Sequence, residues 1–133
     1  MPTPTRDIET EADIALFVAK FYERVRQDPD LGPIFDGVAR VDWPEHLPKI
    51  ERFWSSMLLG TGTYAGNPMP VHFNLARKTS IRPAHFTQWL ALFRQTLTEL
   101  FAGARTEEAL LRAQGIAIVM QARLAGMELL AGD

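Results

Sequence analysis

The sequence predicts an all-α protein. Apolar side chains recur at spacings of three and four through most of the 133 residues, which is the period of a helix buried on one face. No stretch alternates apolar and polar residues as a half-buried strand does. A chain of this length supports one core and is too short for two, so residues 1–133 are expected to form a single domain.

The first helix is expected to end near Gln27. Thr10 and Asp13 resemble a capping pair at its start, and the apolar positions behind them are Ile14, Phe17, Val18, Phe21 and Val25. Residues 1–9, ahead of this cap, are expected to be flexible. Residues 28–30 stop the helix, and residues 31–37 form a loop or one helical turn whose apolar side chains fold inward.

A second helix is expected over Pro44–Leu59, with Gly60 in the usual stop position. Its apolar face consists of Leu47, Ile50, Trp54, Met57 and Leu58. Pro48 would clash with the carbonyl four residues earlier if the helix began at Pro44, so regular helix is expected only from about Leu47. From Gly60 to Arg82 the chain has no sustained period. We expect a long irregular connection there, and such loops usually have a function.

Two further helices complete the scaffold. Pro83 opens the third, which is closed by Gly103, and its apolar positions are Phe86, Trp89, Leu90, Phe93, Leu97, Leu100 and Phe101. Thr106 is expected to cap the fourth, whose stripe is Leu110, Ala113, Ala117, Met120 and Leu124. The expected scaffold is four helices in two pairs around a loop.

Composition excludes several classes of function. A net charge of −2 gives no electrostatic reason to bind nucleic acid or an anionic membrane. No apolar run approaches the ~20 residues of a membrane span, and the first residues lack the pattern of a secretory signal, so a cytoplasmic location is expected. The chain has no cysteine, which excludes thiolate catalysis, iron–sulfur clusters and covalent haem attachment through cysteine pairs.

Two histidines suggest a cofactor site. His46 and His72 are 26 positions apart (72 minus 46), and a neutral imidazole is a common ligand of transition metals and of haem iron. His46 shares a helical face with Ile50, Phe53 and Met57. Taken alone, a histidine in such surroundings is more often a core residue than a ligand. His85, in the first turn of a helix, is interpreted as a surface residue.

Tyr22 and Trp89 are expected to direct polar groups inward. Their spacing from neighbouring apolar residues places both on buried faces, and a buried hydroxyl or indole N–H needs a hydrogen-bond partner. A backbone carbonyl is the ordinary partner, but a polar ligand would serve equally. The aromatic residues around them are by default simple core: Phe21, Phe35, Phe53, Trp54, Phe86 and Phe93.

Several strings in the right order resemble the group III truncated haemoglobins. They cover the chain from about Ile14 to Leu124 and include Phe21-Tyr-Glu-Arg-Val25, Asp30-Leu-Gly-Pro-Ile-Phe35, Trp43-Pro-Glu-His-Leu-Pro-Lys-Ile-Glu-Arg-Phe-Trp54, Met57-Leu-Leu-Gly60, Tyr64-Ala-Gly-Asn-Pro68 and Trp89-Leu-Ala-Leu-Phe93. The resemblance implies a truncated globin, in which two helices pack over two others and enclose a non-covalently held haem b.

The resemblance also implies a role for individual residues. His72 matches the proximal ligand, the protein's metal ligand to the iron, whereas Tyr22, His46 and Trp89 match the polar distal residues, with His46 able to swing as a gate. Around them, Ile50 matches the apolar residue that the family packs over the bound ligand. Trp54 matches a tryptophan of the family, and Lys49 matches a residue that pairs with a haem propionate. The other cofactor contacts expected are Phe35, Phe53, Met57, Phe86 and Phe93. This chain departs from the family at Pro48, next to the gate, and in the longer, polar segment 74–81.

A site of this kind binds dioxygen, carbon monoxide, nitric oxide or peroxide. Donors at Tyr22 and Trp89 would hold polarised dioxygen more tightly than carbon monoxide, so we expect slow oxygen release. Haem peroxidase or nitric oxide dioxygenase activity, served by an unidentified reductase, is the alternative. Two other classes stay open: a non-haem metalloenzyme using His46 and His72 with Glu45 or Glu51, and a cofactor-free helical interaction module.

Overall fold

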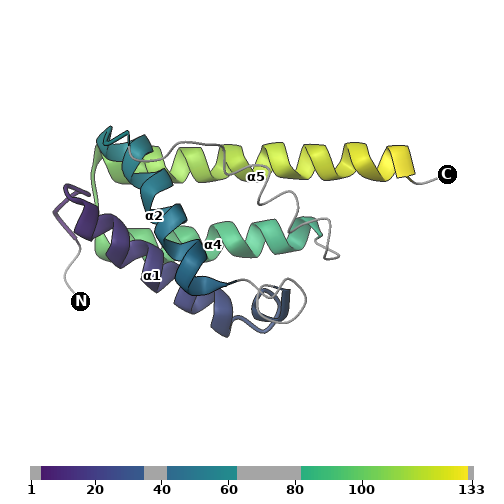
Figure 1. The fold of residues 1–133 in the computed structure, drawn as a ribbon, viewed down its shortest axis with the longest axis horizontal. Helices are drawn as coiled ribbons and strands as arrows, with labels where there is room; N and C mark the ends of the chain where they lie inside the picture. The colour runs from purple at the N-terminus through teal and green to yellow at the C-terminus, as the bar shows by residue number, and fades with distance from the viewer. Residues whose placement is uncertain (1–3, 35–41, 63–81, 132–133) are drawn as a thin grey trace.

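The computed structural model of the chain describes residues 4–34, 42–62 and 82–131, with side chains described as far as residue 122. Four helices account for most of these residues: α1 (Glu11–Gln27), α2 (Trp43–Leu59), α4 (Pro83–Leu100) and α5 (Ala104–Ala131). The described ranges contain no strand, which confirms the all-α prediction. α1 contacts α2 and α4, and α5 contacts α4 and α2. In Figure 1 the pair α1 and α2 lies across one end of the longer pair α4 and α5.

α1 begins at the capping pair that the sequence predicts. The Thr10 hydroxyl accepts the backbone N–H of Asp13 at 3.2 Å, and Asp13 Oδ2 accepts the N–H of Thr10 at 3.1 Å. This reciprocal box satisfies backbone groups that a helix start leaves unpaired. Arg6 donates two hydrogen bonds to the same carboxylate, at 2.8 and 2.6 Å. After the helix, Asp28 Oδ1 accepts the N–H of Leu31, which turns the chain inward and leaves Leu31 buried, as predicted.

α2 begins earlier than predicted. Regular helix starts at Trp43 with Pro48 inside it, so the expected start near Leu47 was wrong. The Asp42 carboxylate accepts the backbone N–H of Glu45, which caps the helix, and the Trp43 side chain is buried against the core. A proline removes one hydrogen bond from the helix ladder. The cap and the buried indole offset that loss and stabilise the earlier start.

The opposite end of α2 is as predicted. Gly60 follows the helix with a φ of 67°, a left-handed conformation that glycine adopts without steric cost. Along the helix, Trp54 and Leu58 are buried in the core as the stripe predicted. Met57, expected on the same face, is 36% exposed instead. The helix therefore has a second apolar side, which is only partly covered.

α5 is capped from the far end of the chain. Asp7 accepts the backbone N–H of Arg105 at 2.8 Å, and the N–H and hydroxyl of Thr106 at 3.0 and 2.7 Å. Thr106 therefore lies inside the first turn as a donor, and the prediction that it caps the helix was wrong. The approach is so close that a Cβ on Gly103 would lie 2.5 Å from the Asp7 side chain. Only glycine fits there.

Residues 6–8 pack against the rest of the protein. Ile8 has no exposed surface and belongs to the main core. The Arg6 carbonyl accepts the N–H of Ala102 at 3.0 Å, and the Ile8 carbonyl accepts a hydrogen bond from Arg105 at 3.0 Å. The segment is thus attached to the corner between α4 and α5.

Interlocking aromatic rings form the core where the two helix pairs meet. Phe17 and Phe21 of α1 are at most 1% exposed, and both meet Phe93 of α4 edge-on, with ring centroids 5.6 and 5.2 Å apart. Trp54 of α2 lies 5.4 Å from the same Phe93 ring. Each such pair adds ~1 kcal/mol beyond the burial of its surface. These contacts fix three helices relative to one another and so position the side chains at one edge of the core.

Candidate functional site

The three predicted distal residues come from three helices and lie together. Tyr22 of α1 is 5% exposed, whereas His46 of α2 and Trp89 of α4 are half-buried. The Tyr22 and His46 rings are 6.4 Å apart, with their planes at 81°. Trp89 acts on the Tyr22 phenol as a hydrogen-bond donor that lowers the pKa of the phenol. Because an indole N–H only donates, the phenol oxygen is the acceptor in this bond. A phenol that accepts one hydrogen bond can still donate its own proton to another group.

Trp43 belongs to the same cluster, and its contribution was not predicted. Its ring lies 5.4 Å from Tyr22 and 5.9 Å from His46. The Arg26 guanidinium stacks over its other side, 5.0 Å from the ring centroid. Trp43 was noted in the sequence only as part of a motif. Its spacing of three from His46 places the two residues on one helical face, and this signal could have found it.

Burial keeps both ionisable groups of the cluster neutral at neutral pH. Desolvation raises the pKa of the Tyr22 phenol, and the hydrogen bond with Trp89 opposes this effect only in part. Desolvation also lowers the pKa of His46; the nearby Lys49 charge acts in the same direction, and Glu45 opposes it. The cluster therefore presents a protonated phenol and a neutral imidazole. Such a pair can donate a hydrogen bond to a polar ligand without introducing a net charge.

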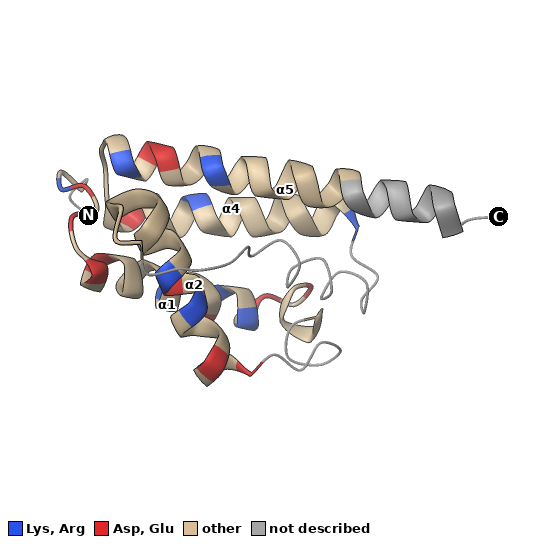
Figure 2. Ribbon diagram, turned by 45° about the horizontal axis from the view of Figure 1, so that its top comes forward, with Lys and Arg blue, Asp and Glu red and all other residues tan. Residues whose placement is uncertain are grey.

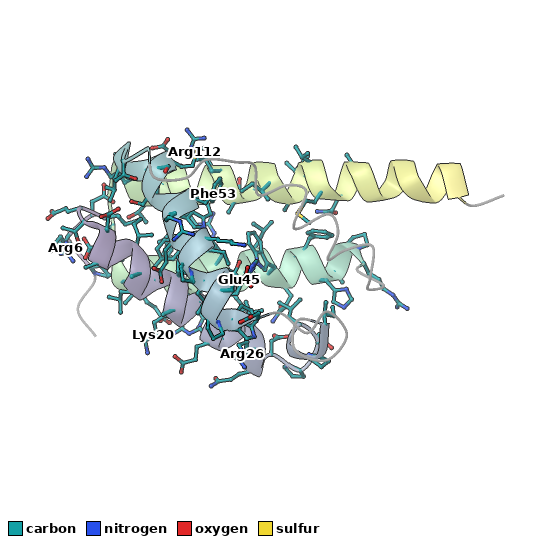
Figure 3. The ribbon with its side chains drawn as sticks, viewed as in Figure 1. Arg6, Lys20, Arg26, Glu45, Phe53 and Arg112 are labelled. Carbon is teal, nitrogen blue, oxygen red and sulfur yellow. The ribbon has the colours of Figure 1, made fainter. Side chains whose placement is uncertain are left out.

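The two sides of α2 have different environments. One side, with Trp54 and Leu58, packs into the core. Next to it, Ile50 is also buried in the core and Phe53 is half-buried and packs against it, whereas Met57 is 36% exposed. Figure 3 marks Phe53 on this helix. Positions 46, 50, 53 and 57 follow a helical repeat, so His46 shares this partly covered apolar side, as its spacing predicted.

Other predicted cofactor contacts lie deeper in the protein. Trp54 and Phe93 are enclosed by core rings, including Phe17 at 6.1 and 5.6 Å. Phe86 is 8% exposed and packs with Ala117 in a smaller cluster between α4 and α5. These three residues support the walls of a site, since each is already packed against protein.

Lys49 lies on the exposed surface of α2. Its Nζ contacts Glu45 Oε1 at 3.1 Å, one helical turn earlier, and both side chains are more than half exposed. Figure 3 marks Glu45 on α2. An exposed pair of this kind contributes little to stability. Lys49 can therefore exchange this partner for another carboxylate at small cost.

Some predicted site residues lie outside the described part of the chain. They are Phe35, the proposed proximal ligand His72, and the segment 74–81. The described geometry therefore concerns the distal side and the helices that frame it.

Among residues 4–34, 42–62 and 82–131, no group of three or more His, Cys, Asp or Glu side chains is arranged to hold a metal ion. Within the same part of the chain, no helix has both the length and the apolar character needed to cross a membrane.

Comparisons with known proteins agree with this architecture. The profile of the family described as bacterial-like globin matches residues 7–121. Group 3 truncated hemoglobin ctb of Campylobacter jejuni is 40% identical over 110 residues, which cover 80% of this chain and 84% of that protein. A crystal structure of group III truncated hemoglobin from Campylobacter jejuni is similar at a TM-score of 0.74 and 38% identity, and the match covers 89% of this chain and 94% of that one.

In the part of the chain that the structure describes, two packed pairs of helices with a polar aromatic cluster at the edge of their core form the arrangement of a globin. The chain belongs to the bacterial-like globin family and, within it, to the group III truncated haemoglobins. Membership of a globin family implies a haem group. The described residues fit a flat apolar group, because α2 leaves Phe53 and Met57 partly uncovered and carries His46 next to the buried phenol of Tyr22.

Proposed function

We propose that this globin holds haem b non-covalently through His72 and reversibly binds dioxygen and related diatomic ligands. The buried phenol of Tyr22, with half-buried Trp89 as a donor to it, carries this proposal on the distal side. The family assignment and the separation of His46 from His72 support the proximal role of His72.

The chain's own residues define the properties of the proposed site. A haem iron held by one neutral histidine supplies an open coordination position for a diatomic ligand. Tyr22 donates its hydroxyl proton to the polar end of such a ligand, while Trp89 holds the phenol oxygen in place. Ile50 covers the site and limits the entry of water. His46 lies at the partly exposed edge, next to Tyr22, where a change of rotamer would open or close access.

Absorption spectra of the ferric, dithionite-reduced and carbon monoxide forms test this proposal directly. We expect a Soret band in all three forms and a five-coordinate spectrum in the reduced protein. His72→Ala is expected to lose the five-coordinate reduced spectrum, and added imidazole to restore it. His85→Ala is the matched control, because His85 Nδ1 accepts the Arg82 N–H at the start of α4. Colourless protein that binds a divalent metal would favour the metalloenzyme instead, and folded, colourless, metal-free protein the interaction module.

A second function, detoxification of nitric oxide or peroxide, is supported by the state of His46. Its lowered pKa and its position beside Tyr22 provide a neutral base next to a proton donor, as proton transfer to or from a reacting ligand requires. Turnover would need electrons from a reductase. We expect His46→Leu to slow peroxide consumption by the reduced protein while carbon monoxide still binds. Unchanged consumption in that variant would remove His46 from the reaction.

A further inference from the structure

The outer side of α5 carries large apolar side chains in water. Leu111 and Ile118 are 67% and 66% exposed, and Val119 is 43% exposed. No charged residue occurs in the ten positions 113–122. In Figure 2 the coloured, charged positions of α5 lie near its start and are followed by a long uncharged stretch. Single exposed apolar residues are ordinary, whereas a row of them on one helix face indicates a contact surface.

Gly115 lies in the middle of this row. Glycine is among the least favourable residues inside a helix, so a reason for it is usually found in packing. A Cβ at Gly115 would meet no atom within 4 Å in the described part of the protein. The glycine therefore makes no room for any described neighbour within the chain. It does leave a flat place on the outer surface, where a second helix could approach closely.

The residues on either side of Gly115 would match those of a second copy of the helix that runs in the opposite direction. Leu111 precedes Gly115 by four positions, and Val119 follows it by four. Glu107, which is exposed, precedes it by eight, and Arg123 follows it by eight. Successive spacings of four form one continuous ridge along a helix. Reversal of the helix direction therefore places apolar positions opposite apolar positions, and an acidic position opposite a basic one.

We propose that two copies of this chain associate through antiparallel α5 helices, with the two-fold axis beside Gly115. Leu111 of each copy then packs near Val119 of the other. The same arrangement brings the acidic position 107 of each copy opposite the basic position 123 of the other. Glu108 and Arg112 already pair within one helix, with Arg112 Nη2 and Glu108 Oε1 3.0 Å apart, so these two charges do not oppose the contact.

The size of this contact makes the dimer weak. From Glu107 to Arg123 the ridge is 16 positions long (123 minus 107), or about 24 Å of helix. A single pair of helices buries less surface than the ~1,200 Å² of a stable standard interface. Association is therefore expected only at high protein concentration, and it would fall as salt screens the opposed charges.

Sedimentation velocity of the full-length holoprotein from micromolar to millimolar concentration provides the first test. The unaltered chain is expected to shift from monomer to dimer over this range. Gly115→Glu should remain monomeric throughout, because the axis brings the two introduced carboxylates together, and its thermal unfolding should not fall. Leu16→Glu is the matched control: Leu16 is also exposed, at 46%, but lies on α1, so this variant should still dimerise. A monomer at all concentrations in the unaltered chain would overturn the proposal.

Cysteine cross-linking tests the orientation. The chain contains no cysteine, so each introduced thiol is the only one present. Gly115→Cys lies beside the axis and should form a disulfide-linked dimer under mild oxidation. Ala104→Cys, three helical turns earlier on the same face, should not, because the antiparallel arrangement separates the two thiols by about 30 Å. Cross-linking at both positions, or only at Ala104, would contradict the antiparallel arrangement.

Discussion

Replacement of Tyr22 by phenylalanine should speed oxygen release about tenfold. The phenol is 5% exposed, so its hydroxyl acts in surroundings of low dielectric where a hydrogen bond is strong. Loss of one such donor to a polarised ligand costs ~1.4 kcal/mol, which corresponds to a factor of ten in a rate or equilibrium constant. Carbon monoxide polarises less, and its release should change less than threefold.

The action of Trp89 on the Tyr22 phenol makes a stronger test possible. Trp89→Phe removes the donor that fixes the phenol oxygen, so this variant should also release oxygen about tenfold faster. The two effects should not multiply, because each substitution already weakens what the other residue contributes. Residues in one hydrogen-bonded network couple by ~0.5–3 kcal/mol. We therefore expect the double variant to release oxygen about twenty- to forty-fold faster, well below a hundredfold.

Stopped-flow replacement of bound oxygen by carbon monoxide measures the oxygen release rates of the unaltered protein, the two single variants and the double variant. Carbon monoxide release from the same proteins is the internal control for general damage to the site. A hundredfold effect in the double variant would show that the two residues act independently, and an unchanged rate for Tyr22→Phe alone would falsify the distal role of the phenol.

Three further predictions follow from single contacts. Asp7→Ala should lower the free energy of unfolding by ~1–2 kcal/mol through loss of the α5 cap, measured by urea denaturation at pH 7. Burial opposes ionisation of Asp7, but its hydrogen bonds outweigh this effect and lower its pKa from 3.8, so the destabilisation should be full above about pH 4 and fade as pH falls through the folded-state pKa. Met57→Gln should change the unfolding of apoprotein by less than ~0.5 kcal/mol and yet speed haem transfer to apomyoglobin severalfold; equal rates would place Met57 away from the haem. Lys49→Gln should speed the same transfer no more than about fivefold, and a larger effect would contradict its exposed pairing with Glu45.

Local signals predicted the helices, because each signal acts within one helical turn. The reciprocal bonds of Thr10 and Asp13 and the left-handed Gly60 are examples, since both depend on residues a few positions apart. The apolar period of α1 likewise identified a face that is in fact buried. Pro48 was misjudged because its cost is local, whereas the gain that offsets it, burial of Trp43, depends on other helices.

The contacts that the sequence did not predict join residues far apart in the chain. Asp7 caps a helix that begins almost a hundred positions later, and no local window contains both partners. Thr106 matched a cap by residue type, but the Asp7 carboxylate reached the open N–H groups. The same limit applied to the distal cluster of Tyr22, His46 and Trp89, whose residues come from three helices. Inward orientation of Tyr22 and Trp89 followed from helical spacing, whereas the effect of Trp89 on the pKa of Tyr22 depends on how α1 and α4 pack.

α2 separates folding from ligand binding by side. Trp54 and Leu58 fill the core, whereas Phe53 and Met57 are left partly uncovered one position before each of them along the same helix. Phe53 packs in part against the core, whereas Met57 is 36% exposed, and an apolar side chain in water adds little to the stability of the folded chain. In the proposed function, a flat apolar cofactor would cover the exposed part of this side when it binds. Truncation on the core side should therefore unfold the protein, while truncation on the other side should leave the fold intact and weaken its hold on haem.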